Sequence, residues 1–216
     1  ILAQEKINLN NEINLFKTHQ GNYIVGKHNF TNNENTLAVI YIVRDPRNLV
    51  KSISNHFSLS LNEACKFLLS PEIIGNGKDY RENPEGLYNL LGKWNDHYKS
   101  WTRNKNNLLV IKYEDLIAKP DVELEKIIQF LKKYLIFETN KDKNNNILKT
   151  TSFENLKKME SEGLFKENVL NKNTKNKVNF FHLGPKNVWQ KNLPIEIISK
   201  IEKNFYNEMK ELHYLQ

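Results

Sequence analysis

Residues 37–57 read LAVIYIVRDPRNLVKSISNHF, and this stretch predicts the fold class. Its first part, residues 37–43, is continuously apolar and rich in β-branched side chains, which is typical of a strand buried on both faces. Pro46 then stands near the first position of a helix, where its missing N–H costs nothing. We therefore expect a strand over residues 37–43 and a helix over residues 46–57.

A second apolar run, residues 108–113 (LLVIKY), predicts another buried strand. Further helices are expected where apolar residues recur at helical spacing: residues 61–69, residues 85–103, a helix capped by Asp121 that extends to residue 135, and residues 194–212. Loops are expected over residues 20–35, 76–84 and 140–146. Strands that alternate with helices predict a three-layer α/β fold around a central parallel sheet.

Composition narrows the functional classes. The 216 residues suit one domain over residues 1–216, with no repeat or linker. No apolar run approaches the roughly 18–20 residues that cross a membrane, so we expect no membrane partner. The net charge of +7 favours anionic partners such as nucleotides, but the many lysines and asparagines are also expected of an AT-rich coding sequence, so the charge decides little. The basic residues are scattered with few aromatics among them, so we expect no nucleic-acid interface.

Cys65 is the single cysteine, and it cannot form an internal disulfide. This fits a reducing compartment and predicts a cytoplasmic protein. Its neighbours Ala64, Phe67 and Leu68 are apolar, which favours a core position over a nucleophile.

Ligands of parallel α/β sheets bind outside the carboxyl ends of the strands, which directs attention to His19, Arg44 and Tyr113. Arg44 ends a strand and Ser52 follows on the next helix, so together they could hold an anion. The alternative is a local Arg44–Asp45 salt bridge, with Ser52 on the helix surface.

Residues 17–19 (Lys-Thr-His) end a short apolar segment, residues 13–17, which we expect to be a strand. His19 could act as a base near neutral pH, and Lys17 could neutralise charge on a transferred group. The alternative is an ordinary polar strand terminus. After the second strand, Tyr113 could stack on a base. Glu114 and Asp115 could be catalytic, but we favour capping of the following turn.

Five segments in fixed order carry a family resemblance. KTH at 17–19, RDPRNLVKS at 44–52, YEDL at 113–116, TSFENL at 151–156 and FFHLGPKNVWQKNL at 180–193 together resemble the cytosolic-type sulfotransferases. The resemblance runs from about residue 16 to the end of the chain. It implies a P-loop NTPase-like sulfotransferase fold and transfer of a sulfuryl group from PAPS (3′-phosphoadenosine-5′-phosphosulfate). The acceptor would be a hydroxyl or amine of a small molecule, the other product PAP, and no metal is implied.

The resemblance also implies site residues. His19 matches the base that takes the acceptor proton, and Lys17 matches a lysine that stabilises the transferring group. Arg44 and Ser52 match the pair that holds the 3′-phosphate. Three residues match positions around the adenine: Tyr113, Thr151 and Phe153. The segment that closes over the 3′-phosphate, usually Arg-Lys-Gly, is here His182, Leu183 and Gly184. Lys186 is the candidate to replace the missing charge.

The chain departs from the family at its beginning. Nothing matches the family's phosphate loop, a Pro-Arg/Lys-Ser-Gly-Thr-Thr-Trp-like run, so we expect an N-terminally incomplete domain. A non-catalytic nucleotide- or anion-binding relative and a P-loop kinase remain as alternatives, although a pure binder has no need for His19. Neither the acceptor nor the oligomeric state is predicted. We expect loops at 20–35, 58–84 and 140–149 to shape an acceptor pocket. For the aromatic residues at 94, 97, 98 and 101 we favour core packing.

Overall fold

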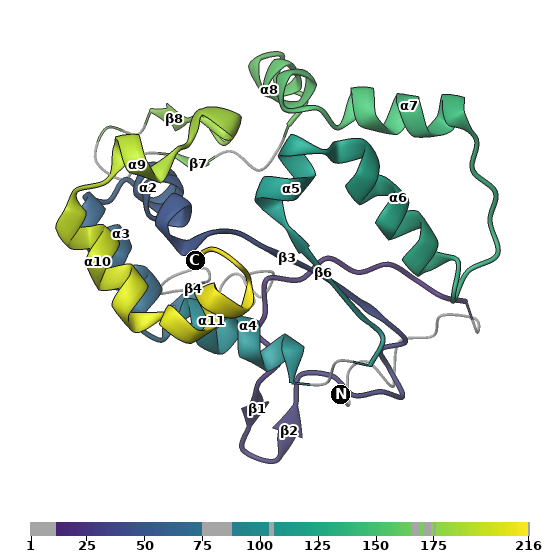
Figure 1. Ribbon diagram of the computed structural model, residues 1–216, viewed down its shortest axis with the longest axis horizontal. Coiled ribbons are helices and arrows are strands. Elements are labelled where there is room, and N and C mark those ends of the chain that lie inside the picture. Colours follow the sequence, from purple (N-terminus) through teal and green to yellow (C-terminus); the bar gives the residue numbers. More distant parts are fainter. Residues whose placement is uncertain are drawn as a thin grey trace.

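The computed structural model describes residues 12–74, 88–103, 106–165, 169–170, 174 and 176–215. Two parallel strands run through its centre, with helices on either side of them (Figure 1). The strands are β3 (Val39–Val43) and β6 (Leu108–Lys112), in register from the first residue of each to the last. This confirms the parallel α/β class and both strand predictions.

The helix that follows β3 has the bounds that the sequence predicts. It is α2 (Pro46–Phe57), and its N-cap Asp45 accepts a hydrogen bond from the Arg47 N–H. Ser58 ends the helix in the left-handed conformation. The next helix, α3 (Leu61–Leu69), begins with a capping box between Ser60 and Glu63.

The core lies between β3, α2, α3 and three further helices, α4 (Trp94–Thr102), α10 (Ile195–Asn204) and α11 (Tyr206–Glu211). Cys65 is buried in it, as predicted for a core cysteine. The Trp94 ring lies 5.1 Å from that of Phe205 and 6.3 Å from that of Tyr98. Core packing, favoured over a pocket, is therefore confirmed for Trp94 and Tyr98.

The single helix predicted over residues 85–103 is wrong. Residues 89–92 form β5 (Asn89–Gly92), which pairs antiparallel with β4 (Glu72–Ile74), and α4 starts only at Trp94. The break falls at Gly92, whose φ of +67° is left-handed and incompatible with a continuing helix. Residues 85–87, and the loop predicted at 76–84, lie outside the described residues.

The loop predicted at 140–146 is also wrong, because these residues begin α7 (Lys141–Thr150). The Asn140 side chain accepts a hydrogen bond from the Lys143 N–H and so caps a helix whose lysine- and asparagine-rich composition resembles a loop. The loop predicted at 20–35 contains a small hairpin of β1 (Ile24–Val25) and β2 (His28–Asn29).

Three further predictions of helices and strands need correction as well. Helix α6 (Pro120–Leu131) begins at Pro120, so Asp121 lies in its first turn and is not its cap. The helix predicted at 194–212 breaks at Phe205, whose side chain turns into the core and is 1% exposed. Residues 13–17 form no strand. The remaining elements are α5 (Tyr113–Ala118), α8 (Phe153–Ser161), β7 (Val169–Leu170), β8 (Lys177–Val178), η1 (Gly184–Lys186) and α9 (Trp189–Asn192).

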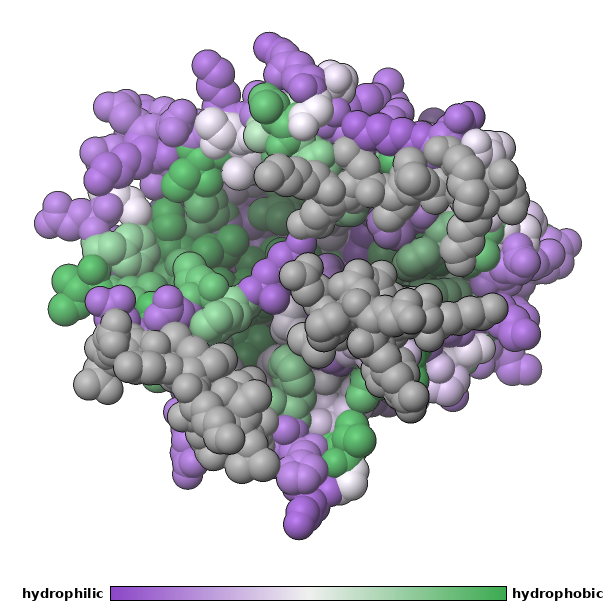
Figure 2. Space-filling view, turned by 180° about the vertical axis from the view of Figure 1, so that it is seen from behind, coloured by the Kyte–Doolittle hydropathy of each residue, from purple (hydrophilic) through white to green (hydrophobic). Residues whose placement is uncertain are grey.

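One face of β3 is more exposed than the sequence predicts. Ile42 is 56% exposed, so the prediction of a strand buried on both faces is wrong for this residue. The reason is that β3 has a single partner strand among the described residues. Figure 2 shows hydrophobic side chains gathered on the surface of the face seen from behind.

Within the described residues, no helix is both long and apolar enough to cross a bilayer.

A buried arginine at the start of α2 joins four parts of the chain. Arg47 donates to both oxygens of Asp45, at 2.6 to 3.1 Å, and to Glu202 of α10 at 2.6 Å. It also donates to the Tyr214 carbonyl at 2.9 Å and lies 4.0 Å above the Trp189 ring of α9. Because its side chain is only 6% exposed, these contacts replace the water that the guanidinium would otherwise bind.

We predict that Arg47→Ala destabilises the fold by about 3–5 kcal/mol, because it leaves the buried Asp45 carboxylate without its partner. Chemical unfolding followed by circular dichroism measures this loss. Arg103→Ala is the matched control. Arg103 is exposed, and its guanidinium donates to the Asn22 carbonyl at 3.1 Å, so we expect a loss of about 1 kcal/mol or less. Equal losses for the two variants would contradict the prediction.

Candidate active site

A cavity of about 380 Å³ lies beyond the carboxyl ends of β3 and β6, where the sequence directs the search. Seven of the eight nucleotide-binding candidates line it: Arg44, Ser52, Tyr113, Phe153, His182, Leu183 and Gly184. The eighth, Thr151, is not among the lining residues, and its exposed hydroxyl donates to the Ile147 carbonyl at 2.7 Å. Residues that are up to 140 positions apart in the sequence therefore meet in one cavity.

Arg44 faces this cavity and is not paired with its neighbour. Its Nη1 donates to Ser52 Oγ at 3.1 Å, and its guanidinium lies 4.3 Å from the centre of the Tyr113 ring. The Asp45 carboxylate binds Arg47, so the alternative of a local Arg44–Asp45 salt bridge is wrong. Arg44 Nε is buried and has no hydrogen-bond partner among the described residues; Glu114 Oε1 is 4.0 Å away. Burial lowers the pKa of Arg44, but a guanidinium stays charged in proteins.

The hydroxyl group of Ser52 is arranged to donate. Its oxygen accepts hydrogen bonds from Arg44 Nη1 and from Asn187 Nδ2, each at 3.1 Å. The nearest acceptor for its proton is the Asn48 carbonyl, at a weak 3.5 Å. Asn187 is buried and also donates to the Asn48 carbonyl at 2.8 Å. Sequence analysis missed Asn187, because nothing in its local pattern sets it apart.

No carboxylate is among the residues that line this cavity. Two lining side chains are basic, Arg44 and Lys51, and two are histidines, His56 and His182. Burial lowers the pKa of His56 from its ordinary value. Sequence analysis also missed Lys51 and His56, although His56 follows Ser52 by four residues and so lies on the same helix face. Lys186, the expected replacement charge, is exposed and is not among the lining residues.

Aromatic rings form much of the remaining wall. The Phe181 ring lies 6.1 Å from that of Phe153 and 5.2 Å from that of Phe180, each edge to face. His56 also meets Phe180 edge to face, with the ring centres 5.8 Å apart. Apolar rings beside cationic donors suit a ligand that combines a flat base with a phosphate group.

Gly184 lets one of these rings approach the backbone. Its φ is +51°, and a Cβ built at this position would lie 2.3 Å from two carbons of the Phe153 ring. Any larger residue would therefore push the ring away from the cavity wall as well as strain the backbone. This supplies a physical reason for glycine at position 184.

We predict that Gly184→Ala destabilises the protein by about 1–3 kcal/mol more than Gly163→Ala, the range typical of overpacking. Gly163 has a φ of +75° and no atom within 4 Å of a built Cβ, so it isolates the backbone strain. Thermal and chemical unfolding of both variants measure the difference. If the two substitutions lower stability by the same amount, the close approach of the Phe153 ring does not explain why residue 184 is a glycine.

Lys17 and His19 lie outside this cavity. Both are exposed, and neither is among the lining residues. The segment around them is held by α4: His97 Nε2 donates to the His19 carbonyl at 3.2 Å, and Trp101 Nε1 donates to the Gln20 carbonyl at 2.9 Å. Burial lowers the pKa of His97, whose Nδ1 accepts from the Tyr41 hydroxyl at 2.8 Å in the neutral form. The structure thus fixes the backbone at His19 but does not bring it together with Arg44 and Ser52.

Glu114 links the start of α5 to the cavity and to the end of the described chain. Its Oε1 accepts from the Asp45 N–H at 3.2 Å and from Asn48 Nδ2 at 3.3 Å, and its Oε2 accepts from the Tyr214 hydroxyl at 3.0 Å. Burial, followed by the Glu114 charge, raises the pKa of Tyr214, so this hydroxyl stays protonated. Capping by Glu114 and Asp115 is therefore wrong: the N-cap of α5 is Lys112, with no side-chain cap.

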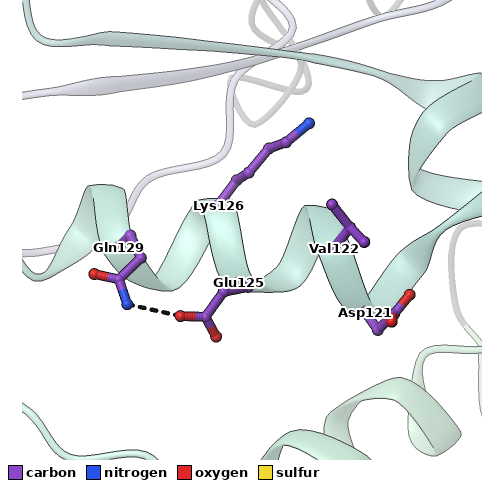
Figure 3. Close-up of a pocket in the computed structure, with 5 residues that line it drawn as sticks. All are labelled: Asp121, Val122, Glu125, Lys126 and Gln129. Atoms are coloured by element: carbon purple, nitrogen blue, oxygen red, sulfur yellow. Dashed lines mark hydrogen bonds between the residues drawn. The ribbon is translucent and has the colours of Figure 1, made fainter.

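A second hollow, of about 480 Å³, lies along α6 (Figure 3). Its five lining side chains come from one helix, and two of them bind each other, because Gln129 Nε2 donates to Glu125 Oε1 at 2.6 Å. Its one cationic side chain, Lys126, already binds Glu123 at 2.5 Å. The hollow has none of the candidate residues and is open, so we place the site at the first cavity. Among the described residues, no group of three or more His, Cys, Asp or Glu side chains could hold a metal ion.

Comparison with known proteins agrees with this geometry. The model of the sulfotransferase domain matches residues 2–213. The chain belongs to the sulfotransferase family. A 3-alpha-hydroxysteroid sulfotransferase of Cavia porcellus is 32% identical over 124 residues, which are 56% of this chain and 39% of the relative. Human sulfotransferase 2A1 is 28% identical over 181 residues, 81% of this chain and 57% of the relative. This sulfotransferase chain thus spans about half the length of the curated relatives it matches.

Solved structures support the same fold. A mouse sulfotransferase complexed with PAP aligns with a TM-score of 0.53 at 21% identity, over 80% of this chain and 58% of that one. Retinol dehydratase in complex with androsterone and the inactive cofactor PAP aligns with a TM-score of 0.55 at 18% identity, over 80% of this chain and 47% of that one. The α/β sulfotransferase fold expected from the sequence is therefore confirmed.

Proposed function

We propose that this protein is a PAPS-dependent sulfotransferase that acts on a hydroxyl or amine of a small molecule. The observation that carries the proposal is the cavity beyond β3 and β6, which combines Arg44, Ser52 and aromatic rings without a lining carboxylate. Such a lining fits a nucleotide that carries a phosphate at one end of the site. Membership of the sulfotransferase family supports PAPS and PAP as the nucleotides, and the likeness in fold to two PAP complexes agrees with them.

The 3′-phosphate is the group that fits Arg44 and Ser52 best. Arg44 Nε is buried without a partner, and the Ser52 proton has only a weak internal acceptor, so an anion would satisfy both. Lys51 lines the same cavity and would add positive charge, and His182 lines it at a position where the family usually has a basic residue. The adenine would lie against Phe153 and Tyr113.

The transfer itself needs positioning and fixed positive charge more than covalent chemistry. The acceptor oxygen attacks the sulfur of PAPS, and the bond from sulfur to the bridging phosphate oxygen breaks, which releases PAP and a sulfate ester. His19 takes the proton that the acceptor oxygen loses, and Lys17 stabilises the negative charge on the transferring group. Both side chains are exposed and so are accessible to an acceptor.

The acceptor belongs to the small-molecule class. Relatives include hydroxysteroid sulfotransferases of Cavia porcellus, and a structural neighbour is complexed with androsterone, so hydroxysteroids are the first acceptors to screen. A kinase is disfavoured because the sulfotransferase model matches residues 2–213. A binding protein without catalysis remains the competing proposal, and the His19 variant below decides between them.

Calorimetric titration of the protein at its full natural length, with PAP and in parallel with ATP, tests the cofactor. Preferential binding of PAP supports a sulfotransferase site, since ATP has no 3′-phosphate for Arg44 and Ser52. Preference for ATP would favour a phosphotransferase. If neither PAP nor ATP binds, the cavity is not a nucleotide-binding site and the proposed function fails.

We predict that Arg44→Ala weakens PAP binding by about 1.5–3 kcal/mol, the scale of a charge-assisted hydrogen bond. The same titration measures it. Arg103→Ala removes an exposed arginine that is not among the cavity's lining residues and should leave the affinity unchanged. Unchanged PAP affinity in Arg44→Ala would remove Arg44 from the site.

We predict that His19→Ala lowers sulfuryl transfer from PAPS to a hydroxysteroid at least 100-fold, the lower end of general-base catalysis. PAP affinity should change little, because His19 is not among the residues that line the cavity. Radiolabelled sulfate transfer and PAP titration measure the two quantities. Near-normal turnover would refute the base assignment, and loss of PAP binding would place His19 in the nucleotide site.

A further inference from the structure

A buried carboxylate behind the cavity has no role in the proposed chemistry. Glu160 lies in the last turn of α8 and is 3% exposed. An acidic side chain near the carboxyl end of a helix is disfavoured by the helix dipole, and burial of its charge adds a further cost. Among the described residues, no lysine or arginine forms an ion pair with this carboxylate that could offset these costs.

The two oxygens of Glu160 bind adjacent peptide groups of another segment. Oε1 accepts from the Phe180 N–H at 2.6 Å, and Oε2 accepts from the Phe181 N–H at 3.0 Å. Hydrogen bonds from backbone N–H groups to an ionised carboxylate are short and strong. Glu160 therefore fixes two consecutive residues whose side chains line the cavity.

The segment that Glu160 holds is tied to the phosphate-binding side at its other end. Residues 180–184 line the cavity, and Asn187, three positions further on, donates to Ser52 Oγ. A shift of the backbone at Phe180 and Phe181 would move residues 182–184 and strain the Asn187 contact. Phe181 also packs edge to face on Phe153, so a smaller part of the shift would reach the adenine side of the cavity.

We propose that Glu160 is a positioning residue of the nucleotide site: its buried carboxylate holds residues 180–184 in the conformation that contacts the 3′-phosphate of PAP. The inference rests on the proposed sulfotransferase function. Glu160 touches no ligand itself and acts through the backbone of Phe180 and Phe181. A carboxylate suits this position because each of its two oxygens accepts one of these hydrogen bonds. An amide has only one oxygen, so it could not replace both acceptors.

Glu160→Gln tests this role, because it keeps the shape and removes one acceptor. We expect it to weaken PAP binding about tenfold, the effect of one lost charge-assisted hydrogen bond. Binding of 5′-AMP, which lacks the 3′-phosphate, should change less than threefold. The ratio of the two affinities is the readout that a merely structural defect would not move, because general destabilisation weakens both ligands alike.

Glu162→Gln is the matched control. It makes the same charge change two residues away on an exposed side chain that forms an ion pair with Lys158 at 3.7 Å, and it should leave both affinities unchanged. If Glu160→Gln does not fold, Glu160→Asp replaces it: the charge stays but the reach shortens, and an intermediate loss of PAP affinity is expected with little effect on 5′-AMP.

The outcomes separate this inference from the function on which it rests. If the native protein does not prefer PAP to 5′-AMP, the proposed function fails and the role of Glu160 falls with it. If the native protein prefers PAP and Glu160→Gln keeps the same preference, the function stands and the Glu160 inference alone is overturned. A selective loss of PAP affinity supports both.

Discussion

The buried guanidinium of Arg47 is the interaction on which the rest of the structure depends. It lies at the first turn of α2 and binds Asp45, Glu202 and the Tyr214 carbonyl, so it joins the turn after β3 to α10 and to residues near the end of the chain. The turn that it fixes is the one that aims Arg44 into the cavity. The two arginines, three residues apart, thus differ: Arg47 is paired inside the fold, whereas Arg44 lines the cavity and its Nε has no hydrogen-bond partner among the described residues.

Around the cavity, contacts within the protein orient the groups that would bind the nucleotide. Arg44 and Asn187 both donate to Ser52 Oγ, so the Ser52 proton points away from these two groups and can be donated to a ligand. Glu114 holds the backbone of Asp45 and the side chain of Asn48, and Asn48 in turn accepts from the Trp189 N–H at 2.9 Å. Preorganised donors of this kind lose little freedom when an anion binds, which raises the affinity that each contact can supply.

The sequence predicts best where the signal is local. A continuous apolar run followed by Asp45 and Pro46 specifies both a strand and the start of a helix. The strand was found over Val39–Val43, within the predicted 37–43, and the helix at the predicted residues. Local signals mislead where composition or spacing hides a break. Gly92 interrupts an apolar pattern that otherwise continues at helical spacing, and Asn140 caps a helix that reads as a polar loop.

The candidate site shows the same contrast between residues that local motifs reveal and residues that only the tertiary structure reveals. Residues carried by recognisable motifs, such as Arg44, Ser52 and Gly184, could be named in advance, and the fold brings them together. Asn187, Lys51 and Glu160 could not, because their importance comes from what the tertiary structure places beside them. Glu160 in particular is an ordinary acidic residue in a polar helix until the backbone at Phe180 and Phe181 folds against it.

The absence of carboxylates from the lining of this cavity has a practical consequence. Arg44 and Lys51 line the cavity without a lining acid, so we expect a positive potential that attracts small inorganic anions as well as nucleotides. At the proposed nucleotide site, phosphate or sulfate in a buffer would compete for Arg44 and Ser52, and added salt would screen the attraction. The apparent affinity for any nucleotide is therefore a property of the protein and its electrolyte together, and is comparable only between solutions of the same anion content.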